Sequence, residues 1–199
     1  MKLLFSPTSP YVRKVRIVAI EKGLAGRVEL VPANPWTDLP AVIARNPLGK
    51  VPALVDDDGN VYYDSPVICE YLDSLVPGNP LTPHSGLARF EVLRRQALAD
   101  GILDAAVAVV LERRRPPGER SPEAERRALD AIRRALDVVA RELAPADAPF
   151  DLAQISFAVA IGYLEFRLPE LAATREKPVL GAFWDAIVTR PSVAATHPA

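Results

Sequence analysis

The chain has 199 residues and a formal net charge of −1, with 24 Lys and Arg against 25 Asp and Glu. This balance does not favour a nucleic-acid or anionic-membrane partner, because both attract strongly basic surfaces. A single cysteine, Cys69, excludes an internal disulfide, and two distant histidines provide no metal-ligand cluster. No apolar run reaches about 18 residues and no signal-peptide pattern is present, so we expect a cytoplasmic protein.

Residues 1–76 alternate between strand and helix patterns. The predicted elements are a strand at 2–5, a helix at 11–22, a strand at 27–31, a short helix at 38–45, a hairpin at 51–63 and a helix at 65–75. Ser65 is predicted as the N-cap of the last helix, with Pro66 at its first position. The predicted order is therefore β-α-β-α-β-β-α.

The character of the chain changes after residue 76. Residues 77–86 are rich in turn formers and predict a linker. Beyond it, the apolar spacing predicts helices at 87–115, 121–143, 151–167 and 179–190, the last stopped by Pro191. Asp151 and Gln154 fit a capping box at the start of the third of these helices. We therefore expect a small α/β domain followed by an all-helical domain at 87–199.

Four stretches, in chain order, resemble motifs of the glutathione S-transferase family. S-P-T-S-P-Y-V-R-K-V resembles its serine-type active-site turn, N-P-L-G-K-V-P-A-L its cis-proline segment, D-S-P-V-I-C-E-Y-L its acid-then-serine helix start, and D-L-A-Q-I-S-F-A-V-A-I-G-Y-L its helix-capping motif. The resemblance covers the whole chain. It implies a thioredoxin-like N-terminal domain, an all-α C-terminal domain and a homodimer.

The resemblance also implies that glutathione is a co-substrate, with no metal, and that its thiol is activated as a thiolate to attack a small apolar electrophile. The glutathione-binding residues implied are Ser9, Trp36, Lys50, Val51, Pro52, Asp64 and Ser65. Ser65 and its helix start would bind the γ-glutamyl carboxylate, and Asp64 the ammonium, although the family more often has Glu or Gln there. Val51, before a cis Pro52, would pair with the glutathione backbone, and Lys50 would meet the glycyl carboxylate.

Each of these residues also has a purely structural interpretation. Asp64 and Ser65 could be a solvated strand end and an ordinary N-cap, Lys50 could be solvated, and the Val51–Pro52 pair could begin an ordinary strand. Ser9 would donate a hydrogen bond to the thiolate as the catalytic residue, or only cap the helix that begins beside it.

The position of Ser9 holds no cysteine, so thiol-disulfide exchange through this turn is not expected. Cys69 is expected to be a small buried apolar residue. The candidates for the second-substrate pocket are Tyr11, Val107, Leu111 and Phe166, and the three in the helical domain could equally belong to its core. The rival function is a binding or adaptor protein of the same fold that lacks turnover.

Overall fold

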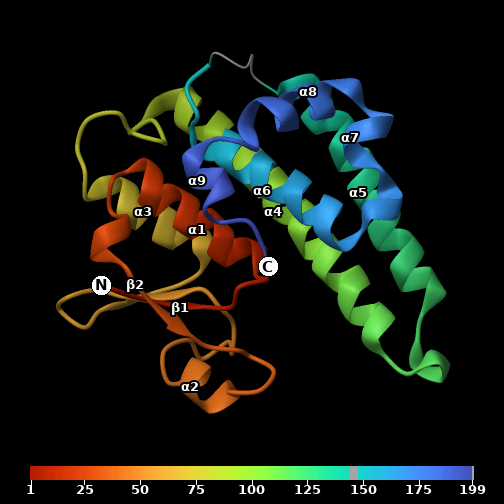
Figure 1. Cartoon of the computed structure of the whole chain (residues 1–199), viewed down its shortest axis with the longest axis horizontal. Helices are drawn as coiled ribbons and strands as arrows, with labels where there is room; N and C mark the ends of the chain where they lie inside the picture. Colours follow the sequence, from red (N-terminus) through yellow and green to blue (C-terminus); the bar gives the residue numbers. More distant parts are fainter. Residues whose placement is uncertain (144–147, 199) are drawn as a thin grey trace. The chain divides into compact units, whose positions relative to one another are not determined.

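The computed structural model describes residues 1–143 and 148–198 and divides into two compact units (Figure 1). The first unit comprises Met1–Gly86 together with Pro191–Ala199, and the second comprises Leu87–Arg190. Within the described residues, no helix is both long and apolar enough to cross a lipid bilayer. The first unit is a mixed α/β domain and the second is helical, as the sequence predicts.

The first unit is built on a four-stranded sheet with the strand order β2-β1-β3-β4. The strands are β1 (Lys2–Phe5), β2 (Glu29–Pro32), β3 (Ala53–Val55) and β4 (Val61–Tyr62). β1 runs parallel to β2 and antiparallel to β3, and β3 runs antiparallel to β4. The helices are α1 (Pro10–Glu21), α2 (Leu39–Ile43) and α3 (Ser65–Ser74), with a 3-10 turn, η1, at Ala25–Arg27. The predicted element order is therefore confirmed.

The sheet buries side chains on both faces, because successive residues of a strand point to opposite sides. Leu4 packs with Ala53 and with Val42 of α2 in one apolar cluster. Leu3 and Leu54 are paired across β1 and β3 and are completely buried on the other face. α1 and α3 pack against each other and lie on the side of the sheet away from α2 (Figure 1). The apolar run that begins the sequence is therefore a central strand.

The predicted linker is held to the first unit by a buried ion pair. Asp73 of α3 pairs with Lys22, which follows α1, at 2.8 Å, and the two side chains are 9% and 3% exposed. The same carboxylate accepts hydrogen bonds from the backbone N–H groups of Leu81 and Thr82, each at 3.0 Å. The chain that leads out of the first unit is therefore anchored to two of its helices.

The second unit is formed by helices of very different length. They are α4 (Gly86–Arg114), α5 (Pro122–Glu142), α6 (Leu152–Arg167), α7 (Ala173–Glu176) and α8 (Pro178–Ile187), with 3-10 turns η2 (Pro117–Glu119) and η3 (Pro169–Leu171). α6 is buried on every side as far as Leu164, because its apolar residues are not confined to one stripe. α5 buries only the stripe formed by Ile132, Leu136 and Val139. The short elements η2, η3 and α7 were not predicted.

The predicted capping box of α6 forms on one side only. Asp151 Oδ1 accepts a hydrogen bond from the backbone N–H of Gln154 at 2.8 Å, as expected of the N-cap. The Gln154 side chain donates instead to the carbonyl of Pro149, which also accepts from the Asp151 N–H. The Asp151 N–H therefore already has a partner, so the reciprocal half of the box is not needed.

The C-terminal segment belongs to the first unit. It forms the short helix α9 (Pro191–Ala194), which contacts α1. Arg13 of α1 donates to the carbonyl of Val193 at 3.2 Å, and Arg16 donates to that of Ala195 at 3.3 Å. The sequence-based division placed this segment in the helical domain. The structure corrects that boundary, because contacts between residues about 180 positions apart decide it.

Candidate functional site

Ser9 lies in the turn between β1 and α1, at the N-cap of the helix. Its Oγ accepts a hydrogen bond from the backbone N–H of Val12 at 3.3 Å, and Pro10 follows as the first helical residue. A hydroxyl has two acceptor lone pairs and one donor proton. Capping uses the oxygen as an acceptor and leaves the proton able to donate. The two interpretations of Ser9, helix cap and thiolate donor, are therefore compatible.

A buried arginine follows Ser9 by one helical turn. Arg13 is 5% exposed, and burial, with the charge of Arg16 as a smaller cause, lowers the pKa of its guanidinium to about 10. Its Nε and Nη1 are buried without a hydrogen-bond partner among the described residues. Sequence reasoning missed this residue, because a basic residue on an amphipathic helix is expected to lie in solvent. Arg13 therefore places a positive charge in the N-terminal half of α1, near the positive end of the helix dipole.

The peptide bond between Val51 and Pro52 is cis, as the family resemblance implies. Val51 precedes β3 and packs against the apolar cluster beneath the sheet. The loop before it is held by Asn46, whose buried side chain donates to the carbonyl of Lys50 at 2.9 Å and accepts from the N–H of Leu48 at 3.0 Å. Asn46 is a supporting residue that the sequence analysis did not single out. The backbone of Val51 is thereby positioned outside the strand pairing.

The start of α3 differs by one residue from the prediction. Asp64 occupies the N-cap position and Ser65 is the first residue of the helix, because the N–H of Ile68 donates to the carbonyl of Asp64 at 3.0 Å. The Asp64 side chain makes no capping hydrogen bond and is exposed, whereas Ser65 is buried. The Tyr63–Asp64 peptide bond is also cis. Asp64 therefore keeps its carboxylate in solvent, beside the first turn of α3.

The side chains of Lys50 and Trp36 are both exposed. The backbone N–H of Trp36 donates to Asn34 Oδ1 at 3.0 Å, which fixes the turn after β2 and leaves the indole outside the core. An exposed cation and an exposed indole N–H are both able to meet an anionic group from solvent.

The register of the sheet brings these segments to one end of it. β1 and β2 are parallel, with Phe5 beside Pro32, so the turns that follow both strands leave at the same end. β3 begins at that end, because it is antiparallel to β1 and Ala53 pairs with Leu4. β4, antiparallel to β3, finishes there. The predicted residues on the four connections are Ser9, Trp36, Val51 and Asp64. A helix start, an unpaired backbone edge and exposed charges therefore meet at one edge of the sheet.

The four candidates for a second-substrate pocket fall in both units. Tyr11 lies on α1 of the first unit and is half-buried. Val107 and Leu111 lie one turn apart on α4, and Phe166 lies near the end of α6; all three are half-buried. None of the three is completely enclosed, so a plain core role does not account for their exposed surface.

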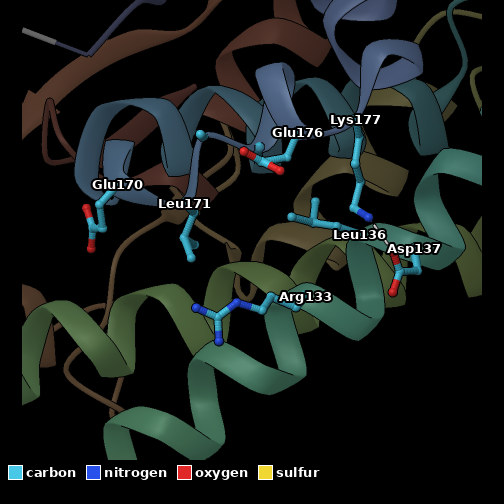
Figure 2. A pocket seen from close by; sticks show the side chains of 9 residues that line it. Arg133, Leu136, Asp137, Glu170, Leu171, Glu176 and Lys177 are labelled. Carbon is cyan, nitrogen blue, oxygen red and sulfur yellow. Dashed lines mark hydrogen bonds and ion pairs between the residues drawn. The ribbon is translucent and has the colours of Figure 1, made fainter.

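A cavity of about 460 Å³ opens in the second unit between α5 and α7 (Figure 2). It is lined by Arg133, Leu136, Asp137, Glu170, Leu171, Ala172, Ala173, Glu176 and Lys177. Lys177 points to Asp137 and pairs with it, while Glu170 pairs with Arg113 at 2.5 Å. The cavity holds none of the predicted site residues. Lys177 and Asp137 neutralise each other, and Glu170 is neutralised by Arg113 outside the lining, so the cavity offers little chemistry of its own.

Comparisons with known proteins place these features in context. Residues 8–75 match the family model described as glutathione S-transferase, N-terminal domain. The chain is 37% identical to the uncharacterized GST-like protein YibF of Escherichia coli, over 100% of this chain and 98% of that protein. It is 44% identical to a glutathione transferase family member from Pseudomonas fluorescens, whose crystal structure contains bound glutathione. The two structures have a TM-score of 0.95, and the match covers 100% of this chain and 98% of that chain.

The same Pseudomonas fluorescens protein has also been solved with bound S-(propanoic acid)-glutathione, with a TM-score of 0.91 and full coverage of both chains. A glutathione S-transferase from Methylobacillus flagellatus, solved with glutathione bound, is 39% identical over 100% of this chain and 99% of that chain, with a TM-score of 0.92.

Proposed function

The chain belongs to the glutathione S-transferase family, and we propose that it is an active glutathione transferase that transfers alkyl or aryl groups to the sulfur of glutathione. The observation that carries the proposal is the convergence of four connections at one end of the sheet, with the Ser9 hydroxyl at a helix start among them. Relatives at 39% and 44% identity hold glutathione in their crystal structures.

The proposed glutathione site uses each part of the sheet edge for one part of the ligand. The first turn of α3, with Ser65, accepts the γ-glutamyl carboxylate, and the exposed carboxylate of Asp64 pairs with the ammonium. The backbone of Val51 pairs with the cysteinyl unit as one added β-bridge. Lys50 and Trp36 meet the glycyl carboxylate from solvent. The thiol then faces Ser9.

Ser9 supplies the larger share of thiolate stabilisation. A free thiol has a pKa of about 8.5, so only a few per cent is ionised at pH 7. The N-terminus of α1 contributes roughly 0.3 to 1 kcal/mol towards an anion, and a hydrogen bond to a charged acceptor contributes roughly 1.5 to 3 kcal/mol. Together they bring the bound thiol to a pKa of about 6.5. The bound thiol is then mostly ionised at neutral pH.

The electrophile is proposed to be small. The relative at 44% identity binds S-(propanoic acid)-glutathione, a thioether that carries a short acid on the glutathione sulfur. By analogy, a compact electrophile suits this chain, and Tyr11, Val107, Leu111 and Phe166 are each kept as candidates for contacting it. We also propose that the protein is cytoplasmic, because reduced glutathione is plentiful in reducing compartments. The proposal of a homodimer follows from the family resemblance.

The test combines a binding measurement with a pH-rate profile. Isothermal titration is expected to detect glutathione at millimolar concentration or below. Ser9→Ala is expected to leave the affinity within a few-fold and to lower conjugation of 1-chloro-2,4-dinitrobenzene at pH 7 by roughly ten- to a hundredfold, with the loss shrinking as the pH rises. The ultraviolet absorbance of bound thiolate should fall in parallel.

Ser121→Ala is the matched control. Ser121 caps α5 as Ser9 caps α1, accepting a hydrogen bond from the N–H of Ala124 at 3.2 Å, so the variant loses a comparable cap in the other unit. Its conjugation rate should stay at the wild-type level. Equal pH profiles for wild type and Ser9→Ala would reduce Ser9 to a helix cap. Glutathione binding without thiolate or turnover would favour the adaptor function.

A further inference from the structure

Arg13 lies one helical turn after Ser9 on α1. The two residues are four positions apart, and the backbone N–H of Arg13 donates to the carbonyl of Ser9 at 3.0 Å. Residues at this spacing share one face of a helix, and side chains lean towards the helix N-terminus. The Arg13 side chain therefore leans towards the turn that holds Ser9. Both residues belong to the first unit, so their spacing does not depend on the second.

The guanidinium of Arg13 is held in place by the C-terminal segment of the first unit. Its Nη2 donates to the carbonyl of Val193 at 3.2 Å, and Val193 is itself buried. The segment is fixed on α1 by a further contact, because the hydroxyl of buried Ser192 donates to the carboxylate of Glu21. The cation therefore has a defined position and does not move freely in solvent.

The charge of Arg13 is not neutralised within the first unit. No carboxylate among residues 1–86 and 191–198 pairs with it, although α3 and its N-cap contribute Asp64, Glu70 and Asp73. The other elements packed on α1 are η1, whose only charged residue is Arg27, and α9, which has no ionisable side chain. Arg13 is 5% exposed, and its Nε and Nη1 have no hydrogen-bond partner among the described residues. Unpaired donors on a buried cation are costly, so an anion is the expected ligand at this end of α1.

We infer that Arg13 stabilises the thiolate of glutathione bound at the start of α1, in addition to the hydrogen bond from Ser9. This inference rests on the proposed function, because it concerns the thiol that Ser9 is proposed to hold. A cation near a thiol favours the ionised form, and the positive end of the helix dipole acts in the same direction. The proton released by the thiol passes to solvent, and no bond to Arg13 forms or breaks.

Two glutathione derivatives separate a charge at the sulfur from the binding of the rest of the ligand. Glutathione sulfonate carries a permanent negative charge where the thiolate would lie, whereas S-methylglutathione is neutral there. Isothermal titration at pH 7 is expected to show that the wild type binds the sulfonate more tightly. Arg13→Gln should weaken sulfonate binding by about tenfold, which corresponds to one pKa unit, and leave S-methylglutathione binding unchanged. Arg13→Lys should keep part of the preference, because it keeps the charge.

The same substitution should change the ionisation of bound glutathione. The ultraviolet absorbance of the thiolate, followed against pH, should give a pKa about one unit higher in Arg13→Gln than in the wild type. From a wild-type pKa of about 6.5, the ionised fraction at pH 7 falls about threefold, and conjugation falls with it. The loss should shrink as the pH rises above the raised pKa. A purely structural role would lower the rate at every pH alike.

Arg16→Gln is the matched control. Arg16 lies three residues farther from Ser9, is half-buried, and donates to the carbonyl of Ala195 at 3.3 Å. The variant therefore loses the same charge and a comparable hydrogen bond to the same C-terminal segment. Its ratio of sulfonate to S-methylglutathione affinity should stay at the wild-type value, because solvent screens a more distant and more exposed charge.

The affinity ratio separates failure of this inference from failure of the proposed function. Equal ratios in wild type and Arg13→Gln would overturn the inference. If the ratio falls in Ser9→Ala alone, the transferase function stands and Arg13 is only a link between α1 and the C-terminal segment. A wild type that binds neither derivative would reject the proposed function and the inference together. Arg13→Met, which keeps the aliphatic stem, decides the same ratio if Arg13→Gln does not fold.

Discussion

The Lys22–Asp73 pair allows a quantitative test of how the first unit is held together. One oxygen of the Asp73 carboxylate lies 2.8 Å from Lys22 Nζ, and its two oxygens accept the backbone N–H groups of Leu81 and Thr82. Lys22 Nζ also donates to the carbonyl of Asn79 at 3.1 Å. Asp73→Asn removes the negative charge at nearly constant volume. It also replaces one acceptor oxygen with an NH₂ group that faces another donor.

The expected cost follows from burial. Removing one partner of a buried ion pair leaves an uncompensated charge and costs about 3 to 5 kcal/mol. Net stabilities are about 5 to 15 kcal/mol, so Asp73→Asn should remove a large fraction of the total. At roughly 2 to 4 °C per kcal/mol for a chain of this size, the Tm should fall by about 6 to 20 °C.

The assay is urea denaturation followed by circular dichroism, with two companion variants. Lys22→Met combined with Asp73→Asn should be more stable than Asp73→Asn alone, because it removes the unpaired buried charge. Glu123→Gln, which breaks an exposed pair with Arg126, should change the midpoint very little, because water screens such pairs. A midpoint for Asp73→Asn equal to that of wild type would show that Lys22 reaches water without its partner and would refute the reasoning.

Two further predictions concern the tyrosine network and the oligomeric state. Burial and a 3.0 Å hydrogen bond to Asp56 raise the pKa of Tyr62 to about 12, so its absorbance at 295 nm should titrate after that of an ordinary tyrosine, and Asp56→Asn should move it back towards about 10. Since the folded pKa is the raised one, this stabilisation is present below about pH 10 and should disappear as the pH rises towards 12. At the start of α4, Leu87 and Phe90 are 83% and 66% exposed, and we expect a second copy of the chain to cover them. Phe90→Glu should sediment as a 21.6 kDa monomer and Val179→Glu as the wild-type dimer, whereas a monomeric wild type would contradict the prediction.

Local sequence determined where most elements begin and end. Pro10 after Ser9 and Asp151 three residues before Gln154 mark helix starts that the structure contains, because capping depends on groups only a few residues apart. The apolar run at 2–5 predicted a buried strand, because a short continuous apolar run is itself a local signal. At Asp64 and Ser65 the local rule was insufficient. Both residue types are good N-caps, and the structure places the cap one residue earlier than predicted.

Tertiary structure alone decided which of these local features meet. Nothing near Arg13 in the sequence indicates that it is buried against Val193. The convergence of Ser9, Val51 and Asp64 depends on the parallel and antiparallel pairing of the strands between them. Burial, strand register and ion pairing depend on residues distant in the chain, so the identity of neighbouring residues does not determine them.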